Sequence, residues 1–143
     1  MKIGELAEAA QCTVETIRYY EKAGLLPKTD RTGNNYRLYS QRHLDRLRFI
    51  RNCRSLDMSQ EEVQSLLALM EKPEKDCDSV NHLIDEHISH VEIRIKELQG
   101  LKEQLTSLRK QCESKRRVKE CGIVKGISSM RVKGKAVASS HLG

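Results

Sequence analysis

The stretch TVETIRYYEKAGLLP, residues 13–27, decides how the first part of the chain folds. It opens on Thr13, a residue type that favours the N-cap of a helix, and apolar side chains then follow at helical spacing. Gly24 fits the left-handed position just after a helix, and Pro27 cannot continue one. The stretch therefore predicts a short helix that begins after Thr13 and ends before Gly24.

The residues before this helix predict a partner for it. Apolar side chains recur at helical spacing over residues 3–10, and Gln11 and Cys12 leave room only for a tight turn. Two short helices joined by a tight turn form a helix-turn-helix. With the apolar face buried, Arg18 and Tyr19 lie on the outer side, where such side chains reach phosphates or base edges of DNA. A solvated helix in some other bundle is the alternative for this pattern alone.

The residues after the helix predict a β-hairpin. The stretch RTGNNYRLYS, residues 31–40, has a turn sequence at Gly-Asn-Asn and alternating side chains from Tyr36 to Tyr39. Such a hairpin forms a wing beside the helix-turn-helix, and its Tyr and Arg side chains can grip a DNA backbone. The wing favours a nucleic-acid partner more strongly than the helix alone does.

Two further helices follow the predicted wing. Ser40 caps the first, whose arginines, including Arg54, lie mostly outward and whose inward positions are Leu44, Leu47, Ile50 and Cys53. Ser59 and Glu62 form a capping box at the start of the second helix. The expected buried stripe of that helix comprises Val63, Leu66, Leu67 and Met70. Pro73 and the charged residues around it end the helix.

A long helix is predicted from Ser79 to Cys112, because this run contains no Pro and a single Gly. Its apolar positions step by three or four residues, as in a coiled-coil seam: Ile84, Ile88, Val91, Ile95, Leu98, Leu101, Leu105 and Leu108. A lone helix of this length with so little core around it is poorly stable, so we expect it to pair with a copy of itself. A symmetric dimer also presents two DNA-binding heads to a two-fold operator.

The charge of the chain is unevenly distributed. Residues 1–54 contain 11 Lys and Arg against 6 Asp and Glu, residues 55–113 contain 7 against 13, and residues 114–143 contain 8 against 1. A basic front section favours a polyanionic partner, although a solvated charged surface is a commoner reason for such a balance.

The sequence also restricts location and chemistry. It shows no secretory signal and no apolar run long enough to span a membrane, so we expect a cytoplasmic protein without a membrane partner. Thiols stay reduced there, and the 5 cysteines are candidates for metal ligation or burial. There is no Ser-His-Asp order, no Gly-rich phosphate loop before a helix and no H-E-x-x-H. We therefore do not expect an enzyme.

Three cysteines, Cys77, Cys112 and Cys121, flank the predicted long helix. A helix over residues 79–112 spans roughly 50 Å at about 1.5 Å per residue, so Cys77 and Cys112 of one chain cannot meet. In an antiparallel homodimer the start of one helix lies beside the end of the other, which brings Cys77 near the other two cysteines of the partner. Three thiolates suit a divalent soft metal ion. Three unrelated thiols are the alternative.

A second metal site is a further hypothesis. His87 and His90 share a helix face at i, i+3, a spacing that metal ligands use, and Glu62 is the candidate third ligand. The capping-box position of Glu62 already explains it, and solvated or hydrogen-bonded histidines are the commoner outcome. Cys12 and Cys53 lie on the buried faces of short helices, and we expect both to be core residues.

The sequence thus predicts a mainly α-helical protein in five segments. Residues 1–72 form a winged helix-turn-helix DNA-binding domain, and residues 73–79 form a linker that carries Cys77. Residues 80–112 form an antiparallel coiled-coil dimerisation helix, and residues 113–130 form a metal-binding loop with a short C-terminal element. Residues 131–143 are expected to be a disordered tail.

The motifs IGELA, TVETIRYYEKAGLL and RTGNNYRLYS resemble the N-terminal domain of MerR-type transcription regulators. The likeness continues through HLDRLRFIRNCRSLDMSQEEV and the long helix, and it covers roughly residues 1–125. The motifs of the second helix and of the wing are highly specific to that family.

The resemblance implies a homodimer that binds a palindromic operator between the two promoter elements. Family members hold an over-long promoter spacer in an unproductive shape, and on binding effector they bend and untwist it so that RNA polymerase can initiate. An efflux pump for the same ion is the natural target gene. The DNA contacts that the resemblance implies are Arg18, Tyr19, Tyr36, Arg37 and Arg54. Thr13, Arg31 and Tyr39, which lie beside them in the same motifs, complete the expected set.

The resemblance also bears on the effector. Copper(I) sensors of the family lack a Cys at the position of Cys77, and zinc sensors have an adjacent Cys pair where this chain has Cys112 and Glu113. Mercury sensors and lead or cadmium sensors have Cys at all three positions, and the stretches DCDSVNHLIDEHISHVEIRI and NCRSLDM are most similar to the lead/cadmium branch. The resemblance therefore implies Pb²⁺ or Cd²⁺ as effector. Hg²⁺, Zn²⁺ or a redox signal through the same cysteines are the alternatives, and a metal-buffering protein is a rival class.

Overall fold

The structure, a computed structural model, describes the chain except residues 32, 34–36, 114, 116 and 133–143. Its elements fall into two units, Met1–Leu83 and Ile84–Gly143. Tyr36 of the predicted wing lies outside the described residues, and so does nearly all of the expected disordered tail, residues 131–143.

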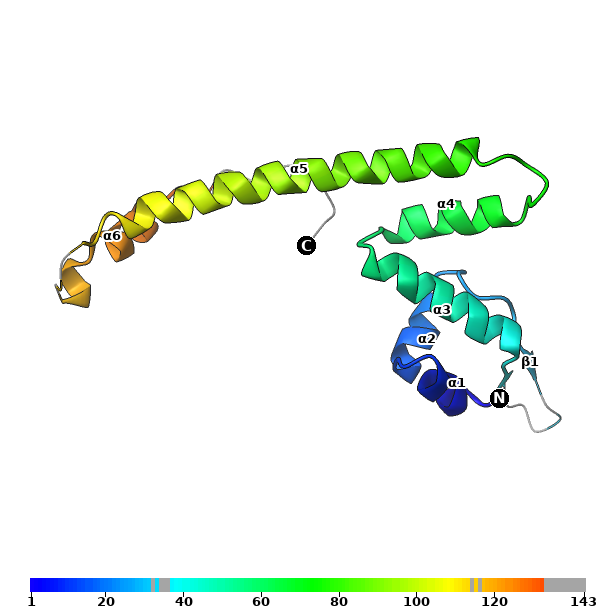
Figure 1. Ribbon diagram of the computed structural model, residues 1–143. Helices are drawn as coiled ribbons and strands as arrows, with labels where there is room; N and C mark the ends of the chain where they lie inside the picture. Colours follow the sequence, from blue (N-terminus) through cyan, green and yellow to red (C-terminus); the bar gives the residue numbers. More distant parts are fainter. Residues whose placement is uncertain (32, 34–36, 114, 116, 133–143) are drawn as a thin grey trace. The chain divides into compact units, whose positions relative to one another are not determined.

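The helix-turn-helix of the first unit consists of α1 (Ile3–Ala9) and α2 (Val14–Lys22) (Figure 1). Thr13 caps α2 as predicted, because its side-chain oxygen accepts a hydrogen bond at 3.1 Å from the backbone N–H three residues on. Gly24 adopts a φ of 75° just after the helix, a backbone conformation that Gly adopts at no steric cost. Local sequence signals therefore set both ends of α2.

A two-stranded antiparallel hairpin forms the wing, with β1 (Asp30–Arg31) paired to β2 (Arg37–Leu38). The start of the chain pairs with the residue that follows β2. The Met1 amino group donates to the Tyr39 carbonyl oxygen at 2.7 Å, and the Tyr39 N–H donates to the Met1 carbonyl oxygen at 2.8 Å. The wing is thereby attached to the segment that leads into α1.

One hydrophobic core joins the helix-turn-helix to α3 (Gln41–Ser55) and α4 (Gln60–Met70). Its fully buried side chains are Leu6, Ile17, Leu47, Ile50, Met58 and Val63. The inward positions predicted for α3 are all buried. Met70 differs from the expected stripe: it is exposed, because it stands in the last turn of α4, beyond the core residues of that helix.

The arginines of α3 are mostly exposed, as predicted, but two of them also hold α1. Arg51 donates to the Ala10 carbonyl oxygen at 2.5 Å, and Arg48 donates to the Ala9 carbonyl oxygen at 3.3 Å. The end of a helix leaves such carbonyls without intrahelical partners, and positive charge is favourable there. The basic face of α3 therefore fixes the C-terminal end of α1.

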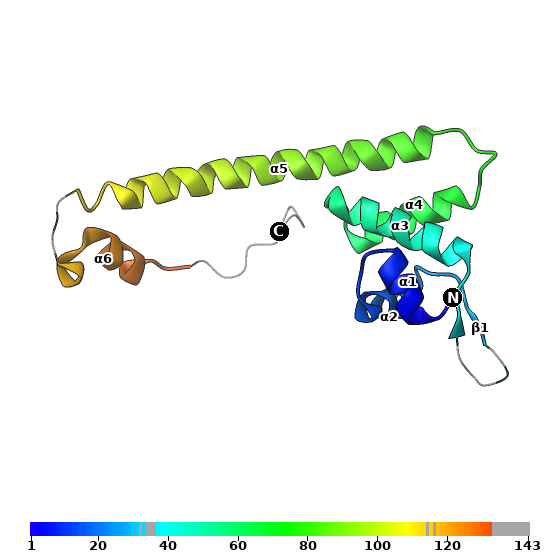
Figure 2. The ribbon, with the colours of Figure 1, turned by 60° about the horizontal axis from the view of Figure 1, so that its bottom comes forward.

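The second unit contains most of α5 (Asp78–Arg109), followed by η1 (Val118–Glu120) and α6 (Gly122–Ser129) (Figure 2). The long helix predicted to reach Cys112 ends at Arg109, and the Arg109 guanidinium donates to the Cys112 carbonyl oxygen at 2.8 Å. Apolar side chains along α5 are exposed in the single chain, namely Ile84, Ile88, Ile95, Leu98, Leu101 and Leu105. Among the helices that the structure describes, none is both long and apolar enough to cross a membrane.

Candidate DNA-binding surface and metal site

The outer face of α2 carries the first two residues predicted to contact DNA. Arg18 and Tyr19 are both exposed, and 57% of the Tyr19 surface is accessible. The Tyr19 hydroxyl donates to Oε1 of Gln60 at 2.5 Å, which links α2 to the start of α4. A guanidinium and a phenol thus stand next to each other on one face, where both can meet a DNA backbone or base edge.

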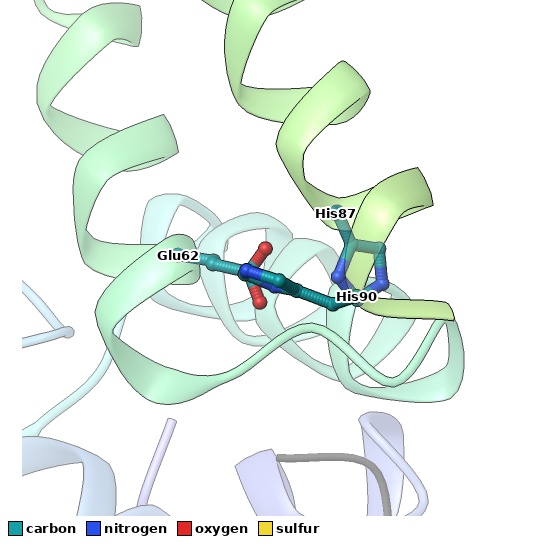
Figure 3. Close-up of side chains that lie close together, drawn as sticks. All are labelled: Glu62, His87 and His90. Carbon is teal, nitrogen blue, oxygen red and sulfur yellow. The ribbon is translucent and has the colours of Figure 1, made fainter. Parts of the chain in front are cut away.

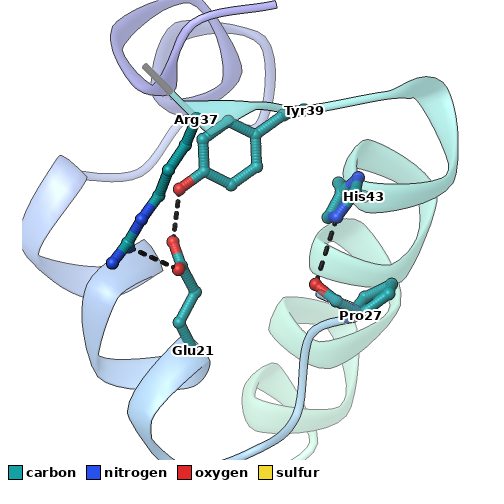
Figure 4. Close-up of polar contacts among 5 residues, drawn as sticks. All are labelled: Glu21, Pro27, Arg37, Tyr39 and His43. Carbon is teal, nitrogen blue, oxygen red and sulfur yellow. Dashed lines mark hydrogen bonds and ion pairs between the residues drawn. The ribbon is translucent and has the colours of Figure 1, made fainter. Parts of the chain in front are cut away.

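A carboxylate on α2 organises the wing, and no sequence motif had indicated this role for it (Figure 4). Oε2 of Glu21 accepts a hydrogen bond from the Arg37 guanidinium at 2.7 Å, and Oε1 accepts one from the Tyr39 hydroxyl. Arg37 remains half-exposed within this ion pair. Glu21 therefore orients the one β2 residue that was predicted to contact DNA.

Tyr39, which was also predicted to contact DNA, lies in the core with 3% of its surface exposed. Burial, with the Glu21 hydrogen bond as the second contribution, raises the pKa of its hydroxyl. A tyrosine in this position connects the end of the wing to α2. The alternation of the sequence placed it on the outer side with Arg37, but the chain leaves the strand at Leu38 and turns into the core.

Three of the other residues predicted to contact DNA take part in hydrogen bonds within the protein. The Thr13 side chain caps α2 and is exposed. Arg54 is exposed at the end of α3, and its guanidinium donates to the Met58 carbonyl oxygen. The backbone of Arg31 pairs in β1, and Tyr36 lies outside the described residues.

His43 fixes the segment between α2 and α3 (Figure 4). Its Nδ1 accepts a hydrogen bond from the Ser40 N–H at 3.0 Å, which places the ring proton on Nε2. Nε2 then donates to the Pro27 carbonyl oxygen at 3.1 Å. The side chain is buried, so this neutral imidazole joins the loop after α2 to the first turn of α3.

A hollow of about 1020 Å³ lies between α1, α2 and β2. Its charged lining mixes both signs: Lys2, Arg18, Lys22 and Arg37 with Glu5, Glu8 and Glu21. Arg18 and Lys22 belong to α2 and Arg37 to the wing, so this hollow adjoins the face predicted to meet DNA.

The second unit brings two of the three candidate metal ligands together. Cys112 follows the end of α5, Cys121 precedes the first residue of α6, and both are half-buried. The backbone N–H of Val124 donates to the Cys121 sulfur and lowers the pKa of that thiol, and a hydrogen bond from the Cys112 side chain adds to the effect. The Arg109 guanidinium favours the thiolate further. Two soft ligands therefore stand side by side, and one of them ionises readily.

Cys77 is exposed and immediately precedes α5. The helix of 32 residues after it is about 48 Å long at about 1.5 Å per residue, and Cys112 comes only after its end. One chain therefore does not assemble the predicted three-cysteine site by itself.

Cys12 and Cys53 differ from the other three cysteines. Cys53 is buried in the core and Cys12 packs against it. Burial raises the pKa of both thiols, which disfavours the thiolate that binds metal. Cys53 is a core residue, as the sequence predicted, whereas Cys12 lies half-buried at the edge of the core.

The three residues of the predicted second metal site are drawn in Figure 3. Oε1 of Glu62 accepts a hydrogen bond from the Ser59 N–H at 2.9 Å and completes the predicted capping box of α4. His87 and His90 lie one turn apart on α5, with their ring centroids 6.3 Å apart. Glu62 belongs to the first unit and both histidines to the second, so their joint site stays a sequence-based prediction.

Known proteins are similar to this chain in sequence and in fold. The family model described as MerR HTH family regulatory protein matches residues 1–69, and the one described as MerR, DNA binding matches residues 44–108. The HTH-type transcriptional regulator ZntR homolog of Haemophilus influenzae is 49% identical over 114 residues, which make up 80% of this chain and 84% of that protein. The mercuric resistance operon regulatory protein of Bacillus cereus is 34% identical over 86% of this chain and 93% of its own.

A solved structure is similar over nearly the whole chain. The transcription regulator PbrR691 from Ralstonia metallidurans CH34, in complex with lead(II), has a TM-score of 0.79 and 46% sequence identity. The match covers 89% of this chain and 98% of that one.

A winged helix-turn-helix followed by a long helix and a cysteine pair defines a metal-responsive transcription regulator, and not an enzyme. The chain belongs to the MerR family of these regulators. This assignment confirms the predicted mainly helical fold with its helix-turn-helix DNA-binding domain and long C-terminal helix.

Proposed function

We propose that this protein is a homodimeric activator that binds a palindromic operator in a promoter spacer and responds to Pb²⁺ or Cd²⁺. Its targets are genes for resistance to, or efflux of, the same ion. One observation carries the proposal: Cys112 follows the end of α5 and Cys121 directly precedes α6, and Cys77 stands just before α5.

The donor set fits a soft divalent ion. Three thiolates around a divalent ion leave a net charge of about −1, and thiolates are the ligands that soft ions prefer. The Arg109 guanidinium, which favours the Cys121 thiolate, reduces the cost of that charge. When bound, the ion supplies a link between the three sulfurs, and the chain's own residues hold two of them in place beforehand.

The third sulfur comes from the second subunit in this proposal. α5 exposes a row of apolar side chains from Ile84 to Leu105, which a second copy of the helix would cover. In an antiparallel pair, Cys77 of one subunit stands beside Cys112 and Cys121 of the other. The dimer then contains two equivalent sites, one at each end of the paired helices.

One related structure supports lead as the effector. A structure at 46% identity contains lead(II). The name of the 49% identical relative indicates zinc as a second candidate. Zinc sensors of the family have an adjacent pair of cysteines, however, where this chain has Cys112 and Glu113. The acidic side chain at that position argues against a two-zinc site.

DNA binding is assigned to α2 and the wing. The exposed Arg18 and Tyr19 supply contacts from α2, and Arg37 supplies one from the wing. The remaining proposed contacts are Thr13, Arg31, Tyr36 and Arg54. Tyr39 acts in this proposal as an anchor for the wing, because its hydroxyl donates to Glu21 and its ring is buried in the core.

The regulator stays on the promoter in both states, in the cytoplasm where the DNA is. Effector binding then redistributes two DNA-bound conformations, one that holds the promoter elements apart and one that lets RNA polymerase initiate. It can do so only as far as the ion's affinities for the two conformations differ.

Operator footprinting with and without Cd²⁺ or Pb²⁺ tests the proposal. Gel shifts are expected to show similar affinity in both conditions, while chemical footprinting shows new distortion at the operator centre when metal is added. Release of the protein from the operator on adding metal would show simple derepression and contradict the proposed activation.

A further inference from the structure

We infer that Gly122 and Gly126 are positioning residues of the metal site, because they let α6 lie directly on the end of α5 and so set the distance between Cys112 and Cys121. The inference rests on the proposed function, since it takes these two cysteines as metal ligands. No sequence motif indicated a role for either glycine in the metal site.

Neither glycine has room for a side chain. A Cβ added at Gly122 would lie 2.2 Å from the Gln111 carbonyl oxygen and 3.1 Å from its carbonyl carbon. A Cβ added at Gly126 would lie 2.5 Å from Oε1 of Gln111 and 3.1 Å from Cδ2 of Leu108. Carbon and oxygen atoms that are not bonded approach to about 3.3 Å even in close Cα–H···O contacts. The backbone of α6 at the two glycines therefore packs directly against Leu108 and Gln111 at the end of α5.

The two glycines form one face of α6. They are four residues apart, so they lie above one another on the helix surface. The opposite side carries exposed apolar residues, including Val124 and Ile127. The glycine face is thus the one turned toward α5, and its lack of side chains decides how closely the two helices approach.

This contact is adjacent to both thiols along the chain. Gln111 is followed by Cys112, and Gly122 is preceded by Cys121. A displacement at the contact between Gln111 and Gly122 therefore moves the two sulfurs relative to each other with no intervening residue to absorb it.

Gly100 offers a matched control within the same unit. It lies inside α5, and apart from the backbone of that helix a Cβ added there would meet no atom of the described residues within 4 Å. Ala is favoured over Gly in an exposed helix interior. Gly100→Ala should therefore preserve or improve folding without touching the cysteine pair.

The test is a titration of the full-length dimer with Cd²⁺ in competition with a chelator. Binding is monitored by the thiolate-to-metal charge-transfer absorption. Gly122→Ala is expected to weaken binding by about 10–100-fold and to alter the charge-transfer band, as substitutions that misplace metal ligands do. Gly126→Ala is expected to weaken binding less, because the Oε1 of Gln111 belongs to a side chain that can rotate away. Gly100→Ala is expected to bind as the unaltered protein does. Operator binding by the metal-free variants checks that the DNA-binding unit is folded.

A rescue variant distinguishes a displaced cysteine pair from a general loss of folding. Gln111→Ala removes the side chain that opposes Gly126 but leaves the carbonyl oxygen that opposes Gly122. The double variant Gly126→Ala/Gln111→Ala should therefore regain affinity, whereas Gly122→Ala/Gln111→Ala should not. This pair of results also keeps the inference testable if Gly122→Ala alone folds poorly.

The outcomes distinguish this inference from the proposed function. If the unaltered protein shows thiolate-bound Cd²⁺ that Cys112→Ser abolishes, while Gly122→Ala and Gly126→Ala bind with unchanged affinity and absorption, the positioning role is wrong and the metal site stands. If the unaltered protein binds no Cd²⁺ through thiolates, the proposed function fails first.

Discussion

In our proposal, a few exposed residues on α2 and β2 contact the operator DNA. Arg18 projects into solvent from the middle of α2, and Arg37 reaches solvent from the wing while Glu21 holds it. Each of these side chains would occur twice in the proposed dimer. Substitutions here should have large effects on operator binding and small effects on folding.

Replacing Arg18 by Ala is expected to weaken operator binding strongly. A base-edge or phosphate contact is worth about 1–3 kcal/mol, and the loss counts once for each of two heads. Binding should be measured at one fixed salt concentration, with dimer formation and Cd²⁺ uptake unchanged. Lys75→Ala, which removes an equal charge from an exposed residue outside α2 and the wing, is the control. Equal operator affinity in the Arg18 variant and the control would contradict the assignment.

Replacing Glu21 by Gln is expected to lower the preference for operator over unrelated DNA. The change removes the ion pair that orients Arg37, and it also removes a negative charge beside the DNA-binding surface. Specific affinity should fall as Arg37 loses its position, while non-specific affinity should rise with the more positive surface. The ratio of the two affinities is the measurement. Glu15→Gln makes the same charge change on an exposed position of α2, so an equal ratio in both variants would show that charge alone matters.

At the scale of elements, helix starts could be predicted from sequence more securely than helix ends. Thr13 and Ser59 cap α2 and α4 as their residue types indicate, because an N-cap is a local hydrogen bond between neighbours. The end of α5 at Arg109 was placed three residues too late, since no Gly or Pro marks it and the Arg109 side chain closes it through the Cys112 carbonyl. Burial of Tyr39 was missed because the partner that holds it, Glu21, is distant in sequence.

α5 is the element whose apolar surface a single chain leaves open. Leu101, 46% exposed here, is expected to be buried in the paired helices, where a Leu side chain contributes about 1.5–3 kcal/mol. Leu101→Glu should therefore shift the protein from dimer toward monomer in sedimentation equilibrium, with two copies of the change in each dimer. Gln99→Glu adds the same charge on an exposed position outside the seam and should leave the dimer intact. An unchanged dimer in the Leu101 variant would exclude this face as the interface.

At the scale of the whole molecule, the candidate site could be predicted only in part. The sequence predicted Cys112 and Cys121 as ligands of one site, and the structure places them at the end of α5 and the start of α6, in the same unit. The glycines that seat α6 were not indicated, because a G-x-x-x-G spacing acquires meaning only once the surface that opposes it is known. Cys77 depends on a second chain in our proposal, and no pattern within one chain tests that.

The intersubunit site is the central claim, and mixed dimers test it most directly. One chain carries Cys77→Ser and the other carries Cys112→Ser with Cys121→Ser, so that all defects fall at one end of an antiparallel pair. Such a heterodimer is expected to retain one complete three-thiolate site and to bind Cd²⁺ or Pb²⁺ with the affinity of the unaltered protein, whereas both parent homodimers lose it. Cys12→Ser and Cys53→Ser should change stability at most. Heterodimers that bind no metal, or a Cys77→Ser homodimer that binds with full affinity, would contradict the account.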